Sequence, residues 1–170
     1  MPNYVALLRA VNVGGTGKLP MSDLKAMCVA EGFERVQTYI ASGNVVFSAS
    51  HGEAKIKAAL EKRLGAYAGK PVGVMVRTAK EMEKVLKSNP FPDAPRNWTF
   101  AIFLDDAPPA NTLETIRGRV DEEVRLGERE IYVSYGAGIG RSSLRIPAGA
   151  NGTARNINTI AKLAELAGAI

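Results

Sequence analysis

The sequence has one cysteine and one histidine among its 170 residues, and aromatic side chains make up only 6% of it. A structural zinc site draws about four ligands, mostly from these two residue types, so a protein-built zinc site is excluded and we expect neither metal nor cofactor. The cysteine, Cys28, has no partner for an internal disulfide. It falls on the apolar stripe of a predicted helix, which favours a buried packing role over a reactive thiol.

Long apolar runs are also missing. No segment approaches the roughly 18 apolar residues that span a membrane. The start, Met-Pro-Asn-Tyr, lacks the basic stretch and apolar core of a signal peptide. Hydrophobic residues still make up 46% of the chain and charged residues 23%, which is enough to bury a core. Together with the lone cysteine, these features predict a cytoplasmic protein that does not bind membranes.

The net charge of +5 is unevenly distributed. Residues 1–78 hold ten Lys/Arg against five Asp/Glu, and residues 79–170 hold twelve of each. The whole excess of positive charge therefore lies in the first half. It indicates either an anionic partner or a solvated basic face, and an excess of this size favours the solvated face.

Apolar periodicity predicts four strands and two helices in residues 1–78. The strands are Tyr4–Val11, Arg35–Ala41, Asn44–Ala49 and Pro71–Arg77; one helix starts at Pro20 and stops at Gly32, and the other carries Ile56, Leu60 and Leu64 and ends at Gly69. The order βαββαβ is that of the ferredoxin-like unit. In that unit the first and third strands are antiparallel neighbours, and the first strand, apolar on both faces, is central.

The second half is less regular. Its apolar pattern predicts a helix at Thr78–Ser88, a strand at Thr99–Leu104, a helix at Asn111–Val120, a hairpin of Glu122–Leu126 with Glu130–Tyr135, and a final helix after Thr153. We therefore expect an α+β fold. A ferredoxin-like unit, 1–78, is followed by a second, incomplete ferredoxin-like unit, 79–170, packed against the first.

Polar residues gather at one edge of the first predicted sheet, where the first strand ends and the third begins. They are Arg9, Asn12, Gly14, Gly15, Ser42 and Asn44. Exposed amides at a Gly-rich turn before a helix attract anions, and an arginine offers bidentate hydrogen bonds to phosphate or carboxylate. In the alternative interpretation, the glycines only let the chain turn and Arg9 pairs with a carboxylate in the core.

A second polar group lies near the C-terminus. It consists of Arg141, in the turn Gly140-Arg-Ser-Ser, and Thr153, Arg155 and Asn156, in Gly152-Thr-Ala-Arg-Asn-Ile-Asn. Thr153 is also a plausible N-cap of the last helix, a role that needs no ligand. If the two halves face each other, a cleft between them holds Arg9, Arg141 and Arg155 near one anion.

Several of these stretches together resemble a known family. They are Ala6-Leu-Leu-Arg-Ala-Val-Asn-Val-Gly-Gly, Tyr39-Ile-Ala-Ser-Gly-Asn-Val-Val-Phe, Asn89-Pro-Phe, Gly138-Ile-Gly-Arg-Ser-Ser-Leu and Gly152-Thr-Ala-Arg-Asn-Ile-Asn-Thr. The chain resembles a widespread bacterial family of uncharacterised cytosolic proteins, domain of unknown function sixteen ninety-seven. The resemblance implies an α+β fold of ferredoxin-like pieces and brings no established activity.

The chain departs from the family pattern at three positions. Members commonly have glycine where Ala10 stands, lysine at Ser143, and a large residue such as tryptophan at Ile157. The serine weakens the case for phosphate binding at the turn after Arg141. The isoleucine weakens the case for base stacking at the last helix.

The function that these residues favour is binding of a small anionic ligand, phosphorylated or carboxylated, between the two halves, in a hydrolase or a ligand sensor. By analogy with acylphosphatases of the same topology, Arg9 would hold the anion and Asn44 or Asn12 would orient water. The alternatives are a nucleic-acid-binding module and a protein-interaction module, as a monomer or a homodimer. Sequence-specific RNA binding is disfavoured because Phe47 is the only aromatic inside the first and third strands.

Overall fold

The computed structural model describes residues 1–11, 18–136, 138–140 and 142–170. Contacts among them define two compact units: unit 1 is Met1–Met82 with Leu163–Ile170, and unit 2 is Glu83–Lys162. The boundaries between the two units fall within the helices α3 (Ala79–Lys87) and α4 (Ile157–Ala169). The division into domains expected at residue 78 stays a prediction.

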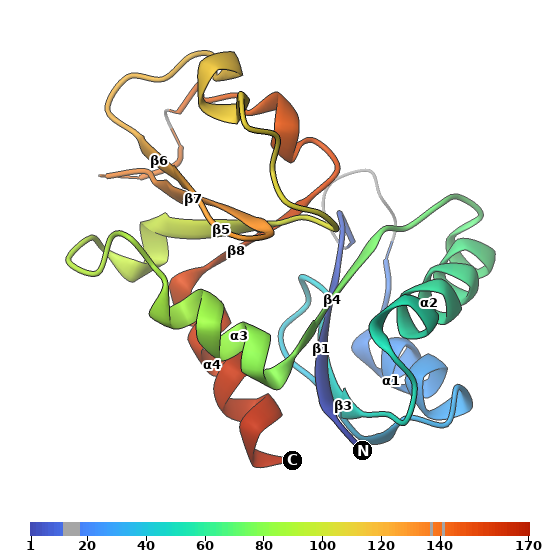
Figure 1. The fold of residues 1–170 in the computed structure, drawn as a ribbon. Helices are drawn as coiled ribbons and strands as arrows, with labels where there is room; N and C mark the ends of the chain where they lie inside the picture. Colours follow the sequence, from blue (N-terminus) through green and yellow to red (C-terminus); the bar gives the residue numbers. More distant parts are fainter. Residues whose placement is uncertain (12–17, 137, 141) are drawn as a thin grey trace. The chain divides into compact units, whose positions relative to one another are not determined.

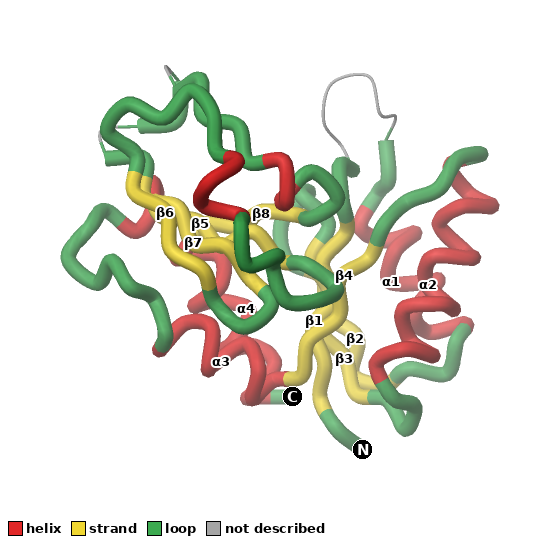
Figure 2. Tube along the Cα trace, turned by 45° about the horizontal axis from the view of Figure 1, so that its top comes forward, coloured by secondary structure: helices red, strands yellow, loops and turns green. Residues whose placement is uncertain are grey.

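Unit 1 is built on an antiparallel sheet with the strand order β2-β3-β1-β4. The strands are β1 (Asn3–Leu8), β2 (Glu34–Thr38), β3 (Asn44–Ser48) and β4 (Val74–Thr78). Helices α1 (Met21–Ala30) and α2 (Glu53–Ala68) lie side by side against one face of this sheet, as Figures 1 and 2 show. This arrangement confirms the predicted ferredoxin-like unit, including the antiparallel pairing of its first and third strands.

The core of unit 1 follows from the apolar pattern of the sequence. In α2, Ile56, Leu60 and Leu64 recur every four residues and are all buried, because this spacing places them on one helix face. The helix ends at Gly69, whose φ of +72° suits a left-handed C-cap. On the sheet, Phe47 of β3 stacks on Phe33 with ring centroids 4.5 Å apart.

The strand β1 is central and shorter than predicted. Every residue from Tyr4 to Leu8 is at most 5% exposed, which confirms that both of its faces are covered. The strand was expected to continue to Val11, but it ends at Leu8. The backbone bends at the next two residues, and Ala10 has a φ of +54°, outside the extended region.

Unit 2 repeats the strand order of unit 1. Its sheet has the order β6-β7-β5-β8, formed by β5 (Thr99–Phe103), β6 (Glu123–Leu126), β7 (Glu130–Ser134) and β8 (Thr153–Asn156). Between β5 and β6 lies only the short 3-10 helix η2 (Thr112–Thr115), and the described residues between β7 and β8 form only η3 (Pro147–Gly149). Another, η1 (Arg96–Trp98), precedes β5. The expected second, incomplete ferredoxin-like unit is thereby confirmed.

Two predictions in this half are wrong. The helix expected at 111–120 is only η2, because the backbone becomes extended at Ile116 and Arg117 then pairs with Arg145. Thr153 is not the N-cap of the last helix but the first residue of β8, which pairs with β5. The cap is Asn156, whose Oδ1 accepts a hydrogen bond of 2.9 Å from the amide of Thr159.

Within the described ranges, no helix combines the length and the apolar character needed to cross a bilayer.

Candidate functional site beside Arg9

The end of β1 and the start of β3 meet at one edge of the unit 1 sheet, as predicted. Leu7 is paired with Asn44, and the amide of Leu8 donates a 2.8 Å hydrogen bond to the carbonyl of Gly43. Gly43 has a φ of +89°, and a Cβ there would lie 2.5 Å from Val11 Cγ2. Only glycine fits this close approach of the two segments.

At this edge Arg9 follows the end of β1 and adjoins Gly73, while Ser42 and Asn44 lie at the start of β3. Asn44 is fully buried, and its Nδ2 donates hydrogen bonds to the carbonyl of Tyr39 and to Ser42 Oγ, both at 2.9 Å. The side-chain amide of Asn44 therefore holds the turn between β2 and β3 in shape. The other predicted members of this group, Asn12, Gly14 and Gly15, lie outside the described residues.

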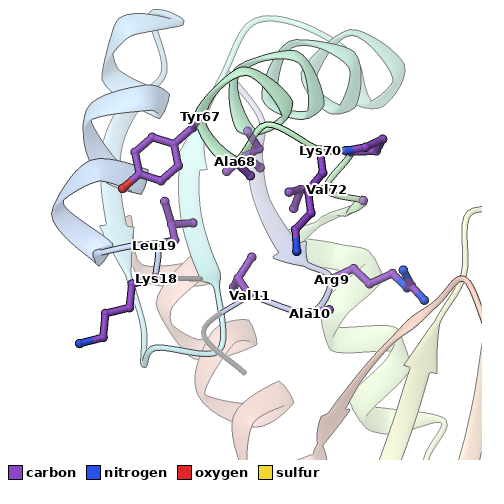
Figure 3. Close-up of a pocket in the computed structure, with 12 residues that line it drawn as sticks. Arg9, Ala10, Val11, Lys18, Leu19, Tyr67, Ala68, Lys70 and Val72 are labelled. Atoms are coloured by element: carbon purple, nitrogen blue, oxygen red, sulfur yellow. The ribbon is translucent and has the colours of Figure 1, made fainter. Parts of the chain in front are cut away.

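A cavity of about 420 Å³ opens beside Arg9 in unit 1 (Figure 3). Four segments line it: the bend after β1, the entry to α1, the last turns of α2 and the connection from α2 to β4. The lining residues are Arg9, Ala10, Val11, Lys18, Leu19, Leu64, Tyr67, Ala68, Lys70, Pro71, Val72 and Gly73. It combines apolar walls with a few polar groups, as small-molecule sites do.

The lining of the cavity includes several cationic residues. Three of its lining residues, Arg9, Lys18 and Lys70, are cationic, and none of the lining residues that the structure describes is Asp or Glu. Figure 3 shows the Lys70 side chain extending toward the segment from Arg9 to Val11. The three cationic residues come from different segments, so chain folding brings them to one cavity, and in Figure 3 the side chains of Arg9 and Lys18 extend outward from it.

Tyr67 closes the side of the cavity next to α1. Its hydroxyl donates a 2.9 Å hydrogen bond to Asp23 in the first turn of α1. That hydrogen bond is the main reason why the pKa of the Tyr67 hydroxyl is raised, with smaller contributions from burial and from the charge of Asp23. The bond ties the end of α2 to the start of α1.

The wall formed by Tyr67, Lys70, Val72 and Gly73 was not predicted from the sequence. A usable signal was present in the predicted topology. In the ferredoxin-like order β4 runs antiparallel beside β1, so the residues before β4 must adjoin the residues after β1. The structure shows this directly, since Leu8 pairs with Val74.

The second predicted group lies in unit 2. Thr153, Arg155 and Asn156 all belong to β8, and Arg141 lies outside the described residues. Arg155 is buried; its Nη1 donates to Thr153 Oγ1 at 2.6 Å and to the carbonyl of Ala154 at 2.9 Å. Burial lowers the pKa of the Arg155 guanidinium to about 10. Since Arg9 belongs to unit 1 and Arg155 to unit 2, the cleft expected to join them stays a prediction.

Cys28 is fully buried in the core of unit 1. Burial raises the pKa of its thiol to about 12, and the charge of Glu31 contributes in the same direction. These properties confirm the packing role predicted for Cys28. In the part of the chain that the structure covers, no cluster of three or more His, Cys, Asp or Glu residues is arranged to hold a metal ion.

Comparison with known proteins places the chain in a family. The sequence model described as "Protein of unknown function (DUF1697)" matches residues 1–132. The chain belongs to this family. The match confirms the resemblance given by the sequence, although the motifs at 138–144 and 152–159 lie beyond the matched range.

A solved structure has the same fold. It is described as that of the conserved bacterial protein SP0830 from Streptococcus pneumoniae, with a TM-score of 0.80 and 22% sequence identity. The alignment covers 97% of this chain and 98% of the other. At this identity the likeness shows the fold alone. No curated protein matches the chain.

Proposed function

We propose that this protein binds a small anionic ligand, phosphorylated or carboxylated, in the cavity beside Arg9. The observation that carries the proposal is the charge of the lining: Arg9, Lys18 and Lys70 contribute three cations, and its described residues contribute no carboxylate. Hydrogen bonds from such cations to phosphate or carboxylate are about twice as strong as neutral ones. Binding in the cytoplasm is part of the proposal, supported by the reduced, buried Cys28.

The cavity also supports an apolar part in the ligand. Val11, Leu19, Leu64 and Val72 form much of its wall. Its volume of about 420 Å³ suits a small molecule rather than an inorganic ion alone. An anionic head next to an aromatic or aliphatic body therefore fits the lining best.

The lining favours binding over hydrolysis. Of the side chains that act as general bases or nucleophiles, its described residues supply only lysine and tyrosine, and the Tyr67 hydroxyl already donates to Asp23. The acylphosphatase analogy gives Asn44 the role of orienting a water molecule. In the structure, the Nδ2 of Asn44 instead donates hydrogen bonds to the carbonyl of Tyr39 and to Ser42 Oγ. A ligand sensor or carrier is the form of the proposal that these contacts support.

Base stacking on the unit 1 sheet has little support. The aromatic residues on its neighbouring central strands, Tyr4 and Phe47, are at most 5% exposed, and Phe47 stacks on Phe33 inside the core. Proteins that recognise RNA on such a sheet stack bases on exposed aromatic side chains. Nucleic-acid binding is the alternative that the experiment below separates from anion binding, and a protein-interaction role stays a prediction.

A thermal-shift titration tests the proposal, with phenyl phosphate and benzoate as anionic probes and phenol as the neutral analogue. The variants are Arg9→Ala, Lys70→Ala and, as a matched control, Lys62→Ala, which removes a cation from an exposed α2 position outside the cavity. A ligand at a hundred times its dissociation constant adds about 2.7 kcal/mol of stability, which is readily seen as a raised Tm.

We expect phenyl phosphate to raise the Tm of the wild type and of Lys62→Ala. Each cavity variant should lose about tenfold in affinity or more, the usual cost of one charge-assisted hydrogen bond. Equal shifts with phenol, or equal loss in all three variants, would contradict the proposal. A shift with short single-stranded RNA alone, fading in salt, would favour the nucleic-acid alternative.

A further inference from the structure

A second cavity, in unit 2, has the opposite character. Its volume is about 680 Å³, and two aromatic residues and two acidic residues are among its lining: Trp98, Tyr135, Asp121 and Glu122. None of its described lining residues is Lys or Arg. It shares no residue with the cavity beside Arg9, so it does not depend on the function proposed above.

The aromatic side of this cavity is held in place by the sheet. Trp98 ends η1 just before β5, and Tyr135 follows β7; the amide of Tyr135 donates a 2.9 Å hydrogen bond to the carbonyl of Trp98. Phe100 packs edge-on against the Tyr135 ring, with centroids 5.5 Å apart and an interplanar angle of 87°. Trp98 and Tyr135 are partly exposed, and both line the cavity.

Gly138 lies next to the Trp98 indole. A Cβ on Gly138 would lie 3.5 Å from Cζ2 of Trp98, which is van der Waals contact, and the φ of +149° at Gly138 suits glycine.

The acidic side carries a carboxylate that stays ionised. Glu122 is 3% exposed; its Oε1 accepts a 2.7 Å hydrogen bond from the amide of Val120, and its Oε2 accepts one from Ser142 Oγ. The hydrogen bond from Ser142, followed by that from Val120, lowers the pKa of Glu122. Both donors are neutral, so they orient the negative charge of Glu122 without cancelling it.

Two other charged residues, Asp121 and Arg119, lie close to Glu122 in the sequence. Asp121 is its exposed neighbour and adds a second carboxylate to the lining. Arg119 Nε donates a 2.6 Å hydrogen bond to the main-chain carbonyl of Glu122. The guanidinium of Arg119 is thus directed to the backbone, and Arg119 is not among the residues that line the cavity.

We propose that the unit 2 cavity binds an organic cation, in which an ammonium group is joined to an apolar body, between Trp98 and Tyr135 on one side and Asp121 and Glu122 on the other. An ammonium ion is attracted to the faces of aromatic rings, and most strongly to tryptophan. Carboxylates next to such rings add a direct charge interaction. An anion would meet two negative side chains there.

Trp98 is the only tryptophan in the chain, so its fluorescence reports on this cavity directly. The probe is benzyltrimethylammonium, with benzyl alcohol as its neutral analogue and benzoate as an anion of similar size. We expect a saturable fluorescence change with benzyltrimethylammonium and an affinity about tenfold higher than for benzyl alcohol. Benzoate should leave the emission unchanged.

The matched variants are Asp121→Asn and Asp93→Asn, which remove the same charge from two exposed positions of unit 2, inside and outside the cavity. Asp121→Asn should weaken binding of the cation at least about threefold, and Asp93→Asn should leave it unchanged. No saturable change up to about 10 mM probe would overturn the proposal. So would equal affinity for benzyl alcohol, or equal losses in the two variants.

Discussion

The amide of Arg9 donates a 2.9 Å hydrogen bond to the carbonyl of Gly73, one residue before β4. This bond extends the β1–β4 ladder past its last paired residues, Leu8 and Val74, and fixes the bend that opens the cavity. Because it uses main-chain atoms only, replacing the Arg9 side chain leaves it in place. Arg9→Ala therefore removes a charge from the cavity while keeping the wall that carries it.

Gly43→Ala should destabilise unit 1 strongly. The new Cβ would meet Val11 Cγ2 at 2.5 Å and Leu8 Cβ at 2.9 Å, at a φ of +89° that alanine rarely adopts. Overpacking and left-handed backbone together cost about 2–4 kcal/mol. Urea denaturation measures this loss.

The control for Gly43→Ala is Gly168→Ala in α4, where a Cβ would meet nothing within 4 Å. Alanine replaces glycine in a helix there, so the free energy of unfolding should rise slightly, by up to about 1 kcal/mol. Equal effects of the two substitutions would show that the close approach of β1 and the turn before β3 is not tight.

Ala10→Gly should stabilise the protein. Ala10 has a φ of +54°, a conformation that costs alanine about 1–2 kcal/mol and glycine almost nothing. The greater freedom of glycine in the unfolded chain offsets part of this gain, which leaves about 0.5–1 kcal/mol. A rise in Tm is the expected result, and a fall would mean that the bend after β1 needs the alanine side chain.

Asn44→Ala should lower stability whatever the ligand. The substitution removes the hydrogen bonds from Nδ2 to Tyr39 and Ser42 at a fully buried site, at a cost of about 1–3 kcal/mol. Chemical denaturation without ligand checks this. If the unfolding free energy is unchanged while anion binding is lost, Asn44 acts on the ligand and not on the turn.

Stability should fall in alkaline solution because of Cys28. The folded thiol has its pKa raised to about 12, whereas a thiol in the unfolded chain ionises near 8.5. Above about pH 8.5 the unfolded state therefore loses a proton that the folded state keeps. This favours unfolding by about 1.4 kcal/mol per pH unit until the folded thiol also ionises.

The Cys28 prediction is checked by comparing the free energies of unfolding of the wild type and Cys28→Ala at pH 8 and pH 10. The variant is less stable at pH 8 because it leaves a small cavity, but it should lose less stability between the two pH values. Parallel losses in both proteins would contradict a buried, neutral thiol.

Local patterns were sufficient to predict the ferredoxin-like unit 1. The four-residue spacing of Ile56, Leu60 and Leu64 and the all-apolar β1 each reflect burial that is set by neighbours in the sequence. The strand β8 was missed because Thr153 and Asn156 are typical helix-start residues. Their pairing with β5, some 50 residues earlier, decides their structure instead.

The candidate site could be predicted only in part, because long-range strand pairing again decides which residues lie together. Arg9 stood out because it ends a strand. Lys70 and Tyr67 did not, since only the pairing of β4 with β1 brings their segment to the cavity. Glu122 was expected only as the first residue of the hairpin strand Glu122–Leu126, but contacts with Val120 and with Ser142, 20 residues away, bury it.

The most direct test of the central claim is a titration of the ¹⁵N-labelled protein with phenyl phosphate, followed by two-dimensional NMR. Binding in the cavity beside Arg9 should shift the amide signals of residues 9–11 and 64–73, apart from proline, and these shifts should weaken together in Lys70→Ala. Shifts confined to other parts of the chain, or none at saturating probe, would contradict the assignment of this cavity as an anion site.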